Sequence, residues 1–118
     1  MLVYMGRDRY EAAGNRYPVL SEAHHGRPGI GPSGAEWIAD HGVSVLCWDF
    51  LDAHGPNIDP LSVHLLIWAI GLALVDNCHL GRAAAALASR GSRAGLLMVA
   101  PLVLERATGC MVNPLFLY

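Results

Sequence analysis

A histidine and a carboxylate, separated by an apolar stretch, form the most chemically informative pair in this chain. His64 and Asp76 lie near the two ends of VHLLIWAIGLALVDN, and Asn77 follows directly. Imidazole nitrogens and carboxylate oxygens are common metal ligands, and a buried carboxylate needs a partner such as a metal or a histidine. The twelve-residue spacing, with one glycine, suits a short helix, a turn and a strand. We therefore expect His64 and Asp76 to meet at one edge of a sheet.

The elements that must position this pair alternate between helices and apolar strands. VSVLCW (43–48) and LALV (72–75) predict buried strands, which end at Asp49 and Asp76. A helix is predicted over about 61–70, ending at Gly71, and another over HLGRAAAALASR, ending at Gly91. GLLMVAP predicts a third buried strand, and further strands are predicted for residues 2–5, for the LVLE that follows GLLMVAP, and for MVNPLFLY.

A third helix start and the alternation of elements complete the predicted fold. Ser33 precedes Glu36 by three residues, the spacing of a capping box, and Gly42 ends this helix. Helices alternating with continuously apolar strands predict a single α/β layered domain over 1–118 with a partly parallel sheet. In such sheets, functional sites lie beyond the carboxyl ends of the strands. Asp49 and Asp76 both follow a strand, so we expect a cleft that contains both.

Four segments of the chain resemble the cyclase family, metal-dependent hydrolases that include bacterial kynurenine formamidase and isatin hydrolase. In chain order they are LVYMGRDRY, RPGIGPSGAEWIADHGVSVLCWD, HLLIWAIGLALVDN and APLVLERATGCMVNP. They resemble the family's TGWxxY stretch with the strand before it, then PGxxxxxAxWLxxxGVxxVGxD, HxxLLxxGIxxxEN and xPLxxxGATGSPxRP. The resemblance covers nearly the whole chain. It implies the C-terminal half of the family's layered β/β/α swivelling fold, truncated at its N-terminus.

The resemblance implies that His64 and Asp76 are metal ligands, with zinc or manganese as the ion and a metal-free site as the alternative. Asp76 stands where the family has glutamate, so the carboxylate is retracted by one methylene. The family's HxGTHxDxPxH motif supplies most of its metal ligands and the catalytic histidine, and this sequence contains no copy of it. Only two ligands carry over, whereas a catalytic zinc site takes three protein ligands and a water.

Asp49 has two interpretations from the sequence. It is either a catalytic residue beside His64 and Asp76, or a structural one that accepts backbone hydrogen bonds. Other polar residues are candidates for extra ligands, with ordinary loop positions as the alternative. Three of them, Asp52, His54 and Asp59, lie in the loop after Asp49, where solvated turn residues are expected. The others are His79, the adjacent pair His24 and His25, and Cys110. Cys110 stands where the family has serine.

Composition and charge argue against two classes of partner. The 118 residues carry a net charge of −2 and no basic run, which argues against nucleic-acid binding. The longest apolar stretch, about 61–75, is too short to span a membrane.

Three widely spaced cysteines without a CxxC favour a reducing, cytoplasmic setting. Because 53% of the residues are apolar and 15% charged, we expect a homo-oligomer or a complementary subunit to cover apolar surface.

Two functional hypotheses follow from these observations. The first is an enzyme of small-molecule metabolism that hydrolyses, dehydrates or cyclises a small carbonyl or acyl substrate. In it, His64 is a metal ligand or a general base steered by Asp76 or Asp49. The second is a non-catalytic scaffold or half of a split enzyme, which needs a partner chain carrying the missing motif.

Overall fold

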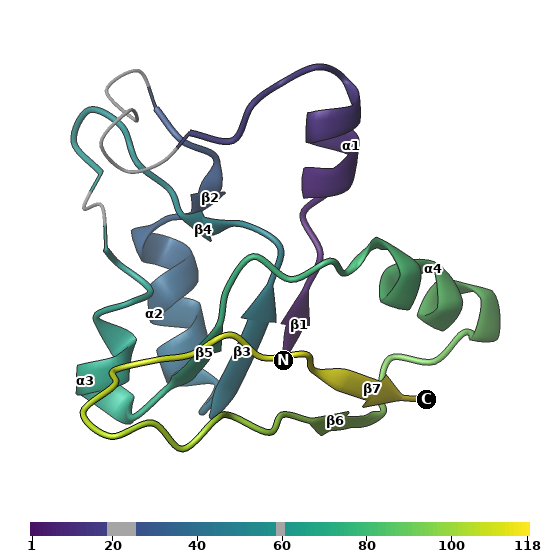
Figure 1. The fold of residues 1–118 in the computed structure, drawn as a ribbon. Helices are drawn as coiled ribbons and strands as arrows, with labels where there is room; N and C mark the ends of the chain where they lie inside the picture. The colour runs from purple at the N-terminus through teal and green to yellow at the C-terminus, as the bar shows by residue number, and fades with distance from the viewer. Residues whose placement is uncertain (19–25, 59–60) are drawn as a thin grey trace. The chain divides into compact units, whose positions relative to one another are not determined.

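The computed structural model describes residues 1–18, 26–58 and 61–118, and Figure 1 shows their secondary structure. The chain divides into two compact units, Met1–Gly81 and Arg82–Tyr118, and each is described by itself. The elements of both units are helical and extended, which confirms a mixed α/β chain. The layered swivelling fold and the single domain over 1–118 stay predictions.

A three-stranded parallel sheet organises the first unit. Its strands lie in the order β1-β3-β5, and Cys47 of β3 pairs with Val75 of β5. Because the strands are parallel, their carboxyl ends meet at one edge of the sheet, from which Asp49 and Asp76 follow. The strand bounds are Leu2–Val3 for β1, Val45–Trp48 for β3 and Ala73–Val75 for β5.

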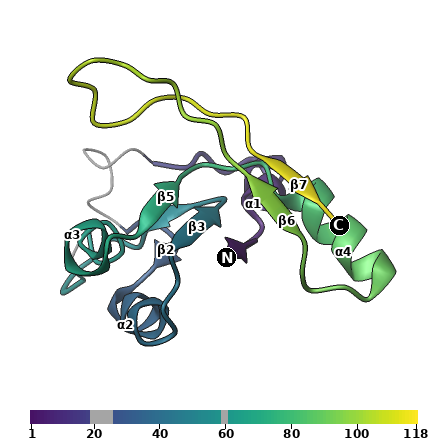
Figure 2. The same cartoon turned by 90° about the horizontal axis from the view of Figure 1, so that it is seen from below.

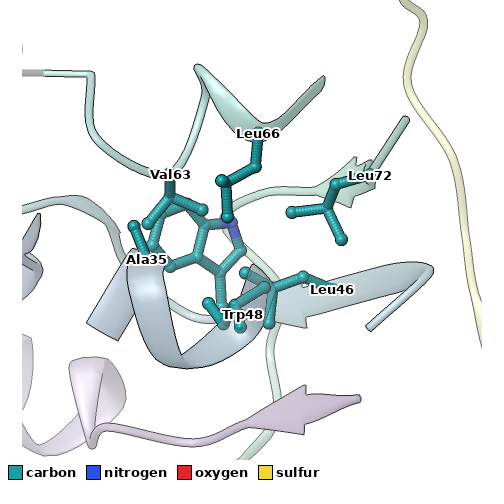
Figure 3. Packing of buried hydrophobic residues seen from close by; sticks show 7 residues of the cluster. Ala35, Leu46, Trp48, Val63, Leu66 and Leu72 are labelled. Carbon is teal, nitrogen blue, oxygen red and sulfur yellow. The ribbon is translucent and has the colours of Figure 1, made fainter. Parts of the chain in front are cut away.

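Two helices share a hydrophobic core with this sheet. Helices α2 (Pro32–Asp40) and α3 (Leu66–Ile70) pack against each other, and Figures 1 and 2 show both near β3 and β5. Trp48 of β3 is fully buried, and Figure 3 shows its indole among side chains from both helices. The buried cluster comprises Ala35, Ile38, Leu46, Trp48, Val63, Leu66 and Leu72.

Three short elements, one helix and two strands, complete the secondary structure of the first unit. Helix α1 (Arg7–Ala12) follows β1, and Gly6 before it adopts a left-handed conformation with φ 91°. That conformation favours glycine, because a side chain at positive φ is strained. Strands β2 (Gly29–Ile30) and β4 (Leu51–Asp52) pair in parallel as a separate two-stranded sheet. The β2–β4 pairing places Asp52 on an extended segment instead of in a loop.

The predicted helix starts are less accurate than the predicted helix ends. Helix α3 ends before Gly71, which is left-handed as a C-cap, and this confirms the predicted end. Its start at Leu66 is later than the predicted 61. The capping box is wrong, because Ser33 lies inside α2 and Gly31 is the N-cap. Pro32 occupies the first helical turn, where its fixed φ suits the helix and its missing N–H costs nothing.

The second unit contains a helix that starts at the boundary and one β-hairpin. Helix α4 (Gly81–Arg90) ends before Gly91 as predicted. Strands β6 (Leu96–Met98) and β7 (Leu115–Leu117) pair antiparallel. The prediction that β6 is buried is wrong, because Leu96 and Met98 are exposed. The predicted continuation through LVLE is also wrong, since residues 102–105 form no strand. None of the helices in the described parts of the chain has the length and apolar character needed to cross a membrane.

Candidate functional site

His64 lies between two carboxylates at the carboxyl edge of the parallel sheet. Its Nδ1 pairs with Oδ2 of Asp52, and its Nε2 lies 3.3 Å from Oδ2 of Asp76. The expected meeting of His64 with Asp76 is therefore present in the structure. The partner on the other side of the ring, Asp52, was expected to be a solvated turn residue. That expectation is wrong, because Asp52 is fully buried.

Asp52 is fixed in place by its neighbours as well as by the imidazole. Its Oδ1 accepts hydrogen bonds from the backbone amides of Val63 at 2.5 Å and His64 at 3.3 Å. The guanidinium of Arg27, itself buried, donates from Nε to the backbone carbonyl of Asp52 at 3.1 Å. A carboxylate that holds both the backbone and the ring of His64 sets the orientation of that ring. Asp52 is thus a positioning residue that sequence reasoning missed.

Asp76 completes the other side of the site and is more open to solvent. Its side chain is 28% exposed and that of His64 30%, whereas that of Asp52 is fully buried. The indole Nε1 of Trp48 donates a 2.5 Å hydrogen bond to Oδ1 of Asp76, which leaves Oδ2 facing the imidazole. The side chains of the site that are partly open to solvent are therefore those of His64 and Asp76.

The two carboxylates determine the protonation state of His64. The hydrogen bonds to Asp52 and then Asp76 raise the pKa of His64 to about 10, although burial acts in the opposite direction. Burial acts to raise the pKa of Asp52, but the hydrogen bonds from the His64 ring and the Val63 amide lower it overall. At neutral pH the ring is therefore an imidazolium, which can donate a proton from Nε2 but has no free nitrogen with which to accept one.

Asp49 follows β3 at the same sheet edge, but its carboxylate is occupied by backbone amides. Oδ2 accepts hydrogen bonds from the amides of Met5, Gly6 and Arg7, and Oδ1 accepts one from Met5, at 2.8–3.1 Å. Asp49 is 2% exposed. This arrangement matches the structural interpretation of Asp49, since the carboxylate holds the segment after β1 and the start of α1. The structure gives it no contact with the imidazole of His64.

A polar contact next to Asp76 joins the segments after β1 and β5. Arg7 donates from Nη1 to Oδ1 of Asn77 and to the backbone carbonyl of Asp49. Its guanidinium also lies 4.5 Å from the ring centre of Tyr17. Asn77 has a positive φ of 55°, a conformation that asparagine tolerates better than most residues. The contact fixes the turn immediately after Asp76.

The residues that the structure describes do not by themselves complete a metal site. Nε2 of His64 and the carboxylate of Asp76 are the two available donors, while Nδ1 is taken by Asp52. Among the described residues, no group of three histidine, cysteine, aspartate or glutamate side chains is placed to hold a metal ion. A catalytic zinc site takes three protein ligands and a water. A catalytic zinc ion therefore needs at least one ligand from beyond the described residues.

The remaining candidate residues lie elsewhere or outside the described chain. His79 is exposed and precedes α4, which begins at Gly81, so no helix places it on one face with Asp76. The backbone of His54 pairs with that of Arg27 in an isolated antiparallel β-bridge. The Nδ1 atom of His54 is buried without a hydrogen-bond partner in the described parts of the chain. Cys110 accepts a hydrogen bond from the amide of Leu102 in the second unit. His24, His25 and Asp59 lie outside the described residues.

Comparisons with protein-family models, curated proteins and solved structures find no significant match for this chain. The resemblance to the cyclase family therefore stays a prediction from the quoted segments.

Proposed function

We propose that this chain is an enzyme of small-molecule metabolism that acts on a small carbonyl or acyl substrate at Asp52, His64 and Asp76. The observation that carries the proposal is the imidazolium held between two carboxylates, one buried and one open to solvent. In this environment the buried carboxylate of Asp52, the imidazolium of His64 and the more exposed carboxylate of Asp76 can each take a different role in proton transfer. A cytoplasmic setting agrees with the three free thiols of Cys47, Cys78 and Cys110.

In the proposed reaction the imidazolium acts as the proton donor. A carbonyl or hydroxyl oxygen of the substrate takes the place of Asp76 as the acceptor of the Nε2 proton. His64 then loses one of the two carboxylates that raise its pKa, so its proton becomes easier to transfer. Asp52 keeps its contact with Nδ1 throughout and prevents the ring from rotating.

Asp76 supplies the complementary base. In a dehydration, its carboxylate takes a proton from the carbon next to the substrate carbonyl. Nε2 of His64 donates a proton to the departing hydroxyl, which leaves as water while a carbon–carbon double bond forms. The same pair serves ring closure, where the carboxylate deprotonates the attacking group and the imidazolium protonates the carbonyl oxygen. Both reactions start from the protonation states of His64 and Asp52 that the hydrogen bonds favour at neutral pH.

The test is a substrate screen with matched variants. Purified protein is incubated with β-hydroxy carbonyl compounds, lactones and N-acyl amides, and turnover is followed by mass spectrometry. Turnover by the natural chain should fall at least about 100-fold in His64→Gln and Asp76→Asn, the range that a general acid or base contributes. His79→Gln is the control, because His79 is exposed and outside the site. Equal loss in the control, or unchanged turnover in both site variants, contradicts the proposal.

A second candidate is a subunit that completes its site with another chain. Two observations favour it: the described residues offer two metal donors, and α3 exposes large apolar side chains. Trp68 is 90% exposed, and Leu65 and Ile67 are about half exposed. A homo-oligomer or a partner carrying the HxGTHxDxPxH motif can cover this surface and add ligands.

Elemental analysis distinguishes the two candidates. The protein is purified without chelator or affinity-tag metal, alone and after co-expression with a chain carrying the missing motif. One zinc or manganese per complex, lost in His64→Gln, supports the split site. Turnover by the isolated chain in the absence of metal supports the first candidate instead.

A further inference from the structure

Arg27 is a buried cation without a carboxylate partner in the described parts of the chain. It is 6% exposed, although arginine is rarely buried unless it is paired. None of the ion pairs between described residues includes it. Its Nε donates to the backbone carbonyl of Asp52 at 3.1 Å, and its Nη nitrogens have no hydrogen-bond partner among the described residues. A neutral carbonyl does not compensate a buried charge, so we expect an anion beside Arg27.

The side chain of His54 lies beside Arg27 and contains a second polar atom without a partner. The two residues are directly opposite each other in the antiparallel bridge, with amide-to-carbonyl hydrogen bonds of 2.8 and 3.0 Å. Residues paired in this way have their side chains on the same face, with Cβ atoms about 4.5–5.5 Å apart. Nδ1 of His54 is buried and unpaired among the described residues. With a proton on Nδ1, the imidazole offers an N–H donor on the face from which the guanidinium also donates.

A second guanidinium near the same aromatic ring adds positive charge. The ring centre of Tyr17 lies 5.9 Å from Cζ of Arg27 and 4.5 Å from Cζ of Arg7. The ring is held in place, because its hydroxyl accepts a 2.9 Å hydrogen bond from the amide of Leu51. Arg7 pairs with Glu11 at 2.9 Å, so among the described residues one carboxylate serves two guanidinium groups. The excess positive charge around Tyr17 favours an anion.

We propose that Arg27 and His54 form a binding site for the oxyanion group of a small molecule, either a carboxylate or a phosphate. The two Nη groups of a guanidinium bind both kinds of oxyanion through parallel N–H···O bonds, and the ligand neutralises the buried charge. Nδ1 of His54 donates to a further oxygen. Arg27 keeps some exposure, so a small anion can reach it.

The anion site does not depend on the proposed enzymatic function. It adjoins the candidate functional site through Asp52, whose backbone carbonyl accepts the hydrogen bond from Arg27 and whose carboxylate holds His64.

The test is an NMR titration of the full chain with sodium phosphate and, separately, with sodium acetate, at constant pH and ionic strength. The ¹⁵N resonance of Nδ1 of His54 and the guanidinium resonances of Arg27 should shift and saturate, with a Kd of about 1 mM. The ring resonances of His79 should not move, because His79 is exposed and outside the anion site. Saturation by phosphate alone supports a phosphorylated ligand, whereas saturation by acetate supports a carboxylate ligand.

Matched variants separate this site from general salt effects. Arg27→Met replaces the guanidinium by an apolar side chain and should raise the Kd at least about tenfold, measured at Nδ1 of His54. Arg82→Gln is the control, since Arg82 is exposed in α4 and its loss changes the net charge equally. His54→Leu keeps Arg27 in place and should also weaken binding, which tests the site even if Arg27→Met does not fold. The proposal is overturned if neither anion saturates the natural chain, or if Arg27→Met binds as the natural chain does.

Discussion

The buried indole of Trp48 donates its only hydrogen bond to the carboxylate of Asp76, at 2.5 Å. This contact joins the hydrophobic core to the candidate site. Trp48 belongs to the cluster that α2 and α3 form with β3, and Asp76 faces His64 with its other oxygen. The position of the more solvent-exposed carboxylate is therefore set from within the core. Changes to core packing should be detectable at the histidine.

Replacing Trp48 tests this link. Trp48→Phe leaves a cavity in the core and removes the donor to Asp76, so the free energy of unfolding should fall by about 2–4 kcal/mol. Trp68→Phe is the matched control, because Trp68 is 90% exposed and its loss should cost less than about 0.5 kcal/mol. Urea unfolding followed by circular dichroism measures both. Equal losses in the two variants contradict the assignment of Trp48 to the core.

Stability should decrease as the pH rises, because His64 has a higher pKa in the folded chain than in the unfolded one. The folded pKa of about 10 stands above the ordinary value of 6.5. The stabilisation is complete below about pH 6.5 and is lost as the pH approaches 10. For a half-buried ring we expect a loss of about 2–4 kcal/mol over that range.

The measurement is urea unfolding between pH 6 and pH 10, together with the ¹⁵N chemical shifts of the imidazole nitrogens. Both ring nitrogens of His64 should remain protonated at pH 8. A His64→Gln variant should show a much flatter dependence of stability on pH. A ring that titrates near pH 6.5 would falsify the imidazolium and with it the proposed proton donor.

Asp52→Asn tests the positioning role of the buried carboxylate. Asparagine keeps the shape but not the charge, so the imidazolium loses its closer partner and the pKa of His64 should fall towards its ordinary value. Breaking a buried ion pair from one side should cost about 2–4 kcal/mol of unfolding free energy. Asp40→Asn is the control, since Asp40 is exposed at the end of α2 and should change neither quantity. An unchanged titration of His64 in Asp52→Asn shows that another group holds the ring.

The parts of the structure that follow from local pattern could be predicted, and the parts that depend on distant contacts could not. The twelve-residue spacing between His64 and Asp76 suits a short helix, a turn and a strand, so these two side chains were expected to meet. Asp52 was missed because a turn-rich loop sequence does not reveal that a β2–β4 pairing buries it. The exposure of β6 was missed for a related reason: an apolar run indicates a strand, but not what covers it.

Asp49→Asn separates the two interpretations that the sequence leaves for this residue. The carboxylate accepts hydrogen bonds from three consecutive amides, and an amide oxygen is a weaker acceptor with no charge. We expect the free energy of unfolding to fall by about 1–3 kcal/mol, with faster amide exchange at Met5, Gly6 and Arg7. The pKa of His64 should not change, because Asp52 and Asp76 hold the ring. If Asp49→Asn instead keeps its stability and abolishes turnover, Asp49 is catalytic and its amide contacts are secondary.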